Sequence, residues 1–261
     1  GAAFGTRLYP RMAGLLLYAA LGAVATSGPV GGVYTHVITE ADDVPWLTLH
    51  GKMGGEYYRL QDAKLDELTL SWDGPGPLKA AAKLIGENLD FPAAWTATNS
   101  EADNAGGKFR GAGGSFKADV DSAVPVTAPV KAGEVKFTNG LSAEILSDSI
   151  RPQEIFPTVL VPSVSLTLKP DDLLRWREAV TGSAAGTAIQ DTPVYGSFEV
   201  KFVIDANTDL VIAATRVPFL AEFPEANPSG EPAELVLVGE ADKPSAGAAI
   251  TATLRNAQAS Y

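Results

Sequence analysis

The stretch of chain from residue 54 to residue 86 constrains the fold most, because its middle has the periodicity of an extended strand. There Leu68, Leu70 and Trp72 alternate with polar residues. Alternation with a period of two is the mark of a strand that buries one face and leaves the other in contact with water. The segment therefore predicts a strand whose leucines and tryptophan point into a core.

A tight turn and a second extended segment follow this strand. The Gly-Pro-Gly-Pro run at residues 74–77 predicts the turn, because glycine allows positive φ and proline fixes φ near −65°. Residues 78–85 are short and stop at Gly86, so we expect them to form the return strand of a hairpin. Their alanines and lysines leave a short helix as the alternative.

The same alternation recurs along the whole chain and indicates a mainly β fold. One segment differs: LLRWREAVTG at residues 173–182 has the apolar spacing of a helix, with Asp171 or Asp172 as its N-cap and Gly182 at its end. The expected strands lie within residues 33–50 (broken at 42–45), 135–145, 159–168, 196–204, 210–223, 233–239 and 248–255.

The composition limits the chemistry available to the chain. Its 261 residues can bury a large core, as one elaborated domain or two small ones. The net charge of −11 argues against a surface that grips nucleic acid through its phosphates. The chain has no cysteine, which excludes disulfides, thiolate metal sites and a cysteine nucleophile. Its two histidines, His36 and His50, leave little material for metal or acid–base chemistry.

Motifs that would indicate a reaction are incomplete. His36 lies within an alternating segment without a serine or cysteine motif, so we interpret it as structural. The glycine-rich residues 111–114 lack the spacing and context of a phosphate loop. Asp119 and Asp121 lack the further ligands of a calcium loop and are expected to be solvated. The sequence therefore predicts no catalytic, cofactor-binding or metal-binding residue, and no enzyme.

The first 30 residues contain a short apolar run after two basic residues. Arg7 and Arg11 precede residues 12–25, whose Ala-Val-Ala end imitates a signal-peptidase site. The run is too short to span a bilayer. We expect a buried amphipathic helix or a docking arm within residues 1–30, and no membrane partner.

Two stretches of the sequence resemble the major tail tube protein of long-tailed, siphovirus-like bacteriophages. One begins with Gly-Gly-Glu-Tyr-Tyr-Arg at residues 54–59 and continues through the Leu-x-Leu-Ser strand and the Gly/Pro turn to Leu-Ile-Gly. The other runs from Leu16 to His36, with Leu-Leu-Tyr, Leu-Gly and Tyr-Thr-His. The resemblance implies a β-sandwich with one or two short helices, a single tail-tube domain over residues 1–261, whose strands join an inter-subunit β-barrel.

The resemblance also implies a structural virion protein that assembles with itself. Hexameric rings would stack helically into the phage tail tube, the conduit for DNA ejection, after assembly in the host cytoplasm. Its implied partners are the tape measure protein, the tail terminator and baseplate proteins, and transiently DNA in the lumen, without any cofactor. An acidic subunit suits such a conduit because it repels phosphates. The lumen-lining candidates, taken from the polar sides of alternating strands, are Glu67, Thr69, Ser71, Glu199 and Lys201.

Two other kinds of protein remain as alternatives. Another ring protein of the tail, a terminator or a baseplate ring, would share the pattern. A carbohydrate-binding β-sandwich would need exposed aromatic side chains in a row, with Trp46, Trp72 or Trp95 as the stacking platform. The position of Trp72 on an alternating apolar face favours the core over such a platform.

Residues 99–130 differ in composition from the rest, with many glycines and acids. We expect a flexible inter-strand loop there. This loop and the arm at residues 1–30 are expected to pack across subunit boundaries in an assembled tube.

Overall fold

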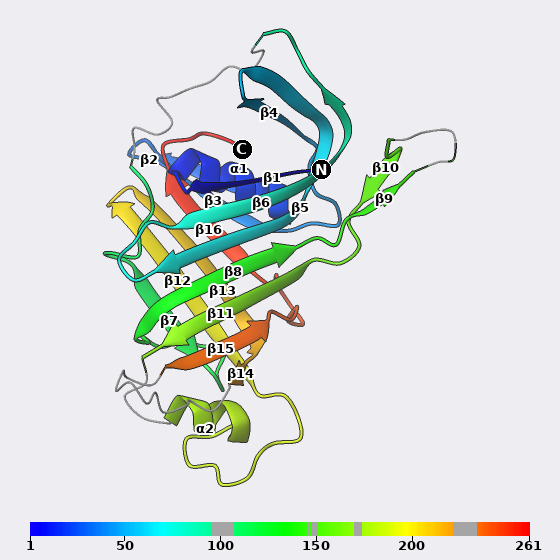
Figure 1. The fold of residues 1–261 in the computed structure, drawn as a ribbon. Helices are drawn as coiled ribbons and strands as arrows, with labels where there is room; N and C mark the ends of the chain where they lie inside the picture. Colours follow the sequence, from blue (N-terminus) through cyan, green and yellow to red (C-terminus); the bar gives the residue numbers. More distant parts are fainter. Residues whose placement is uncertain (95–106, 146, 148–150, 170–173, 222–233) are drawn as a thin grey trace.

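The fold is a sandwich of two antiparallel sheets (Figure 1). A computed structural model describes residues 1–94, 107–145, 147, 151–169, 174–221 and 234–261. Strands dominate, with 55% of the chain in strands against 9% in helices, which confirms the mainly β prediction. The strands form no closed barrel within the described residues of the subunit.

The larger sheet is built around β5, the strand that the alternation at residues 68–72 predicted. Its order is β1-β6-β5-β8-β11-β15-β14, and β4 pairs with the first half of β5. The hairpin with β6 is confirmed, with Ser71 opposite Lys79, so residues 78–85 do not form the alternative helix. The strands are β1 (Ala2–Arg7), β4 (Leu47–Met53), β5 (Glu56–Asp73), β6 (Lys79–Asp90), β8 (Val130–Thr138), β11 (Val161–Leu168), β14 (Leu220–Ala221) and β15 (Leu235–Glu240).

The smaller sheet contains strands from both ends of the chain, in the order β2-β3-β16-β13-β12-β7. Each strand predicted from alternation contains an observed strand in its described part. The strands of this sheet are β2 (Gly22–Val30), β3 (Val33–Glu40), β7 (Ser115–Asp119), β12 (Tyr195–Asp205), β13 (Thr208–Pro218) and β16 (Thr251–Asn256).

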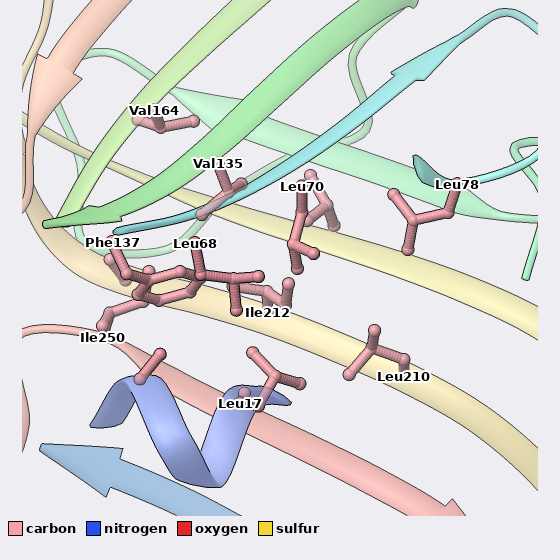
Figure 2. Close-up of a cluster of buried hydrophobic side chains, with 14 of the residues drawn as sticks. Leu17, Leu68, Leu70, Leu78, Val135, Phe137, Val164, Leu210, Ile212 and Ile250 are labelled. Carbon is pink, nitrogen blue, oxygen red and sulfur yellow. The ribbon is translucent and has the colours of Figure 1, made fainter. Parts of the chain in front are cut away.

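The core fills the space between the two sheets. Trp72 is buried, as its place in the alternation predicted. Its ring stacks on Phe116 with 5.7 Å between centroids and meets Phe202 edge-on at 5.2 Å. Figure 2 shows Leu68 and Leu70 from one sheet facing residues of the other. Apolar burial between the two layers is therefore what holds the sheets together.

Helix α1 (Pro10–Leu21) packs against strands of both sheets and contributes Leu17, which is fully buried, to the core (Figure 2). Pro10 starts the helix, and Gly22 ends it with a φ of 95° that disfavours other residues. The expected buried helix is confirmed. Whether residues 1–30 also contact a neighbouring subunit stays a prediction, and Leu15 of the helix and Val30 at the end of β2 are exposed.

The prediction of a flexible loop over residues 99–130 needs correction in its described part. Residues 99–106 lie outside the described part of the chain. Residues 115–119 form β7, which pairs with β12 from Ser115 to Asp119, so this part of the predicted loop is a strand. The glycines around it hid a short alternation in which Phe116 and Ala118 point inward.

Helix α2 (Leu174–Thr181) confirms the helix predicted at residues 173–182. Gly182 has a φ of 71° and donates its N–H to the carbonyl of Glu178, which is the helix end expected from glycine. The proposed caps Asp171 and Asp172 lie outside the described residues.

A two-stranded hairpin projects away from the sandwich (Figure 1). It consists of β9 (Ser142–Glu144) and β10 (Glu154–Phe156), and it pairs with neither large sheet in the described residues. It leaves the end of β8 and returns at the start of β11, so its base lies at one end of these strands.

Candidate assembly surfaces

The outer face of the larger sheet carries three of the five predicted lumen residues. Glu67, Thr69 and Ser71 are half-buried and alternate along β5 with the core side chains. The carboxylate of Glu67 forms an ion pair with the ammonium of Lys136 on β8 at 2.8 Å. Hydroxyl residues continue the face on β11, where Ser163 stands opposite Lys136. The surface is therefore polar, and the Glu67 carboxylate on it is neutralised by a lysine.

The other two predicted residues lie on the outer face of the smaller sheet. Glu199 accepts a hydrogen bond from Lys117 at 2.6 Å. Lys201 pairs with the buried carboxylate of Asp209 at 2.9 Å, and Arg255 pairs with the same carboxylate at 3.3 Å. The five candidates thus belong to two surfaces on opposite sides of the sandwich, and the structure does not bring them together.

The edges of the two sheets differ in how well they are covered. Strand β1 pairs only with β6, and β2 only with β3, within the described part of the chain. The edge strand β7 is covered, because Ala118 donates to the carbonyl of Val126 at 2.9 Å and Ala128 donates to that of Phe116 at 3.0 Å. Open edges are templates for pairing with another chain. Strands β1 and β2 are therefore the candidate pairing edges.

An acidic group between β7 and α2 departs from the expectation of solvated acids. Asp119 is buried, and its carboxylate lies 3.7 Å from the guanidinium of Arg175, which also binds the buried Glu178 at 2.9 Å. The hydrogen bond to Asp119, together with desolvation and the neighbouring carboxylates, raises the pKa of Asp121 to about 6. These groups link α2 to the smaller sheet, and their role in the fold is structural.

His36 occupies the structural place predicted for it. It is fully buried on β3, where its Nε2 donates to the carbonyl of Gln258 at 2.9 Å. Its Nδ1 then accepts from the hydroxyl of Thr26 at 2.9 Å. Both ring nitrogens of this buried side chain are thus satisfied by hydrogen bonds within the fold.

A cluster of basic residues was missed by the sequence reasoning. Lys108 and Arg110 directly precede the glycine-rich residues 111–114, which were considered only as a phosphate loop. In the fold both line a pocket of about 480 Å³, and Arg7 from the end of β1 lies close to Lys108. The available signal was two cations within three residues in an acidic chain.

The tryptophans do not form a binding row among the described residues. Trp72 is in the core, and Trp46 is half-exposed, with the ammonium of Lys64 lying 4.4 Å from its ring centroid. Trp95 lies outside the described part of the chain. The described part contains no group of three or more His, Asp or Glu side chains arranged to hold a metal ion. None of its helices has the length and apolarity needed to cross a membrane.

Comparison with known proteins identifies a family for almost the whole sequence. A family model described as phage tail tube protein matches residues 1–255. The comparison with curated proteins finds no match. The family match agrees with the resemblance seen in the β5–β6 hairpin and with the sandwich fold. The chain therefore belongs to the phage tail tube protein family, structural proteins of the virion tail that self-assemble into the tail tube.

Proposed function

We propose that the chain forms hexameric rings that stack helically into the tail tube, and that this tube is the conduit for DNA ejection. The family match over residues 1–255 carries the proposal. The open edges of β1 and β2 support it, because they belong to different sheets and do not repeat one surface. Contacts between unlike surfaces generate rings when the rotation closes. Pairing between subunits would also remove edges that otherwise promote aggregation.

The outer face of the larger sheet is our proposed lumen wall. Glu67, Thr69 and Ser71 are its candidate residues, and β1 at the edge of the same sheet would extend the wall to the next subunit. The ion pair of Glu67 with Lys136 leaves this lysine less available to hold a DNA phosphate. Glu199 and Lys201 then lie on the face turned away from the lumen.

The proposed partners follow from the shape of a tube, which encloses a lumen and has two ends. The tape measure protein would fill the lumen during assembly, and DNA would pass through it transiently. The tail terminator and the baseplate proteins would contact the two end rings. In this function the chain performs no catalytic step and needs no cofactor.

Electron microscopy of the purified chain tests the assembly. Concentrated protein should form hollow tubes in negative stain, with sixfold symmetry in end-on views. Failure to form rings or tubes at any concentration would overturn the proposal, and rings of another order would overturn the hexamer.

Selective labelling tests the lumen wall, because the chain has no native cysteine. In tubes of Thr69→Cys, a small maleimide should react while a bulky polyethylene-glycol maleimide should not. In tubes of Glu199→Cys, both reagents should react. The reverse pattern would place the smaller sheet at the lumen.

A further inference from the structure

The basic cluster missed by the sequence reasoning is built by the backbone of Phe109. The N–H of Phe109 donates to the carbonyl of Leu8 at 3.1 Å, and its own carbonyl accepts from Leu78 at 2.9 Å. Its side chain is fully buried. This anchoring places the flanking Lys108 and Arg110 next to Arg7, which precedes Leu8.

The three cations of this cluster have no carboxylate partner in the part of the chain that the structure describes. None of them forms an ion pair within the described residues. The pKa of Lys108 is lowered first by the charge of Arg7, then by desolvation and by the charge of Arg110, and no carboxylate contributes to the shift. In a chain of net charge −11, this group of three cations is a local excess of positive charge.

The surroundings of the cluster add to its positive potential. Tyr9, the N-cap of α1, lines the same pocket as Lys108 and Arg110. The first turn of α1 contains no acidic residue, and no side chain caps its N–H groups. The positive end of the helix dipole therefore faces the same region. The pocket has a volume of about 480 Å³, enough to receive the tip of a side chain.

A complementary charge lies on the projecting β9–β10 hairpin. Glu144 and Glu154 are exposed and stand directly opposite each other in the ladder, so their side chains share one face. Neither has an ion-pair partner in the described part of the chain. Two like charges facing each other destabilise a hairpin, which a cationic partner would reverse.

The two charged groups lie at opposite ends of the larger sheet. Arg7 stands opposite Lys79 in the β1–β6 ladder, at the end of the sheet where β1 finishes and β6 begins. The hairpin follows Thr138 of β8, which pairs with Glu67 at the other end. Figure 1 shows the hairpin extending beyond the sandwich on the side away from the end of β1. One subunit cannot join the two groups, whereas two copies in succession can.

We propose that the Glu144–Glu154 face of the hairpin in one copy docks on the Arg7–Lys108–Arg110 cluster of the next copy. The contact is between unlike ends of the molecule, so it repeats from copy to copy and propagates the assembly. It rests on the proposed self-assembly and names the side chains that hold successive copies in register. Charge complementarity of this kind selects the partner and its orientation.

Charge reversal and charge exchange test the contact. Reversing the charges on either side of the contact should raise the critical concentration for tube formation about tenfold, the change expected when close interfacial charge pairs are lost. The two double variants are Lys108→Glu/Arg110→Glu for the cluster and Glu144→Lys/Glu154→Lys for the hairpin. Mixing the two variants should restore co-assembly, because each then supplies one matched contact. Wild-type assembly should weaken with added salt.

Matched controls separate this contact from general charge effects. Two control variants reverse the same number of charges at exposed residues outside the proposed contact and should leave the critical concentration unchanged. They are Lys169→Glu/Arg177→Glu and Asp42→Lys/Glu56→Lys. Circular dichroism checks folding. If a reversal variant does not fold, the neutral variant of the same side replaces it, Glu144→Gln/Glu154→Gln for the hairpin or Lys108→Gln/Arg110→Gln for the cluster.

The outcomes are distinct. Reversal variants that assemble like the wild type would overturn the contact while leaving the tube intact. Loss in both variants without rescue on mixing would also overturn it, since the cluster would then bind another anion. A wild type that forms no tubes would instead overturn the proposed function.

Discussion

The phenol ring of Tyr261 lies edge-on against the imidazole of His36, with 4.7 Å between the ring centroids and 78° between their planes. The Tyr261 hydroxyl donates to the carbonyl of Pro10 at 3.3 Å and accepts from Asn256 at 2.5 Å. A Cβ placed on Gly14 of α1 would come within 2.1 Å of this ring. The last residues of the chain are therefore clamped over the first helix.

This clamp predicts that the effect of Gly14→Ala depends on Tyr261. In the wild type, alanine should displace the ring and destabilise the protein by about 1–3 kcal/mol, as overpacking does. In a Tyr261→Ala background the same change should stabilise by up to about 1 kcal/mol, because alanine favours a helix over glycine. Urea unfolding of the four proteins gives the coupling energy, and additive effects would contradict the clamp.

Asn139 should contribute more to stability than an ordinary asparagine. It is buried, and its amide donates to the carbonyls of Ala20 at 3.1 Å and Leu65 at 2.8 Å, which ties the end of α1 to β5. Asn139→Ala leaves these carbonyls without a partner and should lower the free energy of unfolding by about 1–3 kcal/mol. The control Asn88→Ala removes a half-buried bond to Gln61 and should cost less than about 1 kcal/mol. Equal costs would show that the Asn139 bonds are replaced by water.

Trp72→Ala should be among the most destabilising single changes. The residue is only 4% exposed and contacts Phe116 and Phe202 across the sandwich. Loss of a buried tryptophan and the resulting cavity should cost about 3–5 kcal/mol. Trp46→Ala, at a residue that is 49% exposed, should cost about 1 kcal/mol or less. Thermal unfolding of both variants measures the difference, and similar losses would place the core elsewhere.

The raised pKa of Asp121 predicts a specific dependence of the free energy of unfolding on pH. Its pKa is raised in the folded protein from 3.8 to about 6, so the folded state binds more protons than the unfolded state between these values. The free energy of unfolding should therefore fall as pH rises through this window. Asp121→Asn should be more stable than the wild type at pH 7, by less than about 1 kcal/mol because solvent screens this exposed position.

Below about pH 3 the wild type and Asp121→Asn should converge, since Asp121 is then mostly protonated in both folded and unfolded states. Asp191→Asn, at an exposed residue, is the control and should not change the slope. A difference from the wild type that is the same at pH 4 and pH 7 would exclude titration of Asp121 as its cause. Urea unfolding across this pH range measures the effect.

Local patterns were enough to predict most of the strands, although β1, β2 and β7 were missed. The alternation of Leu68, Leu70 and Trp72 specifies which side chains point inward, because the side-chain period of a strand is set by its own backbone. The apolar spacing of residues 173–182 located α2 for the same reason. The hairpin of β5 and β6 was equally readable, since its turn lies between its two strands.

Tertiary structure decided which strands share a sheet and which surfaces meet. Glu67 and Glu199 have the same local pattern, yet they lie on opposite sides of the sandwich, because sheet membership depends on partners far away in the chain. Strand β1 finds its partner in β6, and Phe109 joins Arg7 to Lys108 only through backbone bonds formed in the folded chain. These contacts depend on the packing of the complete core, which no local window of sequence contains.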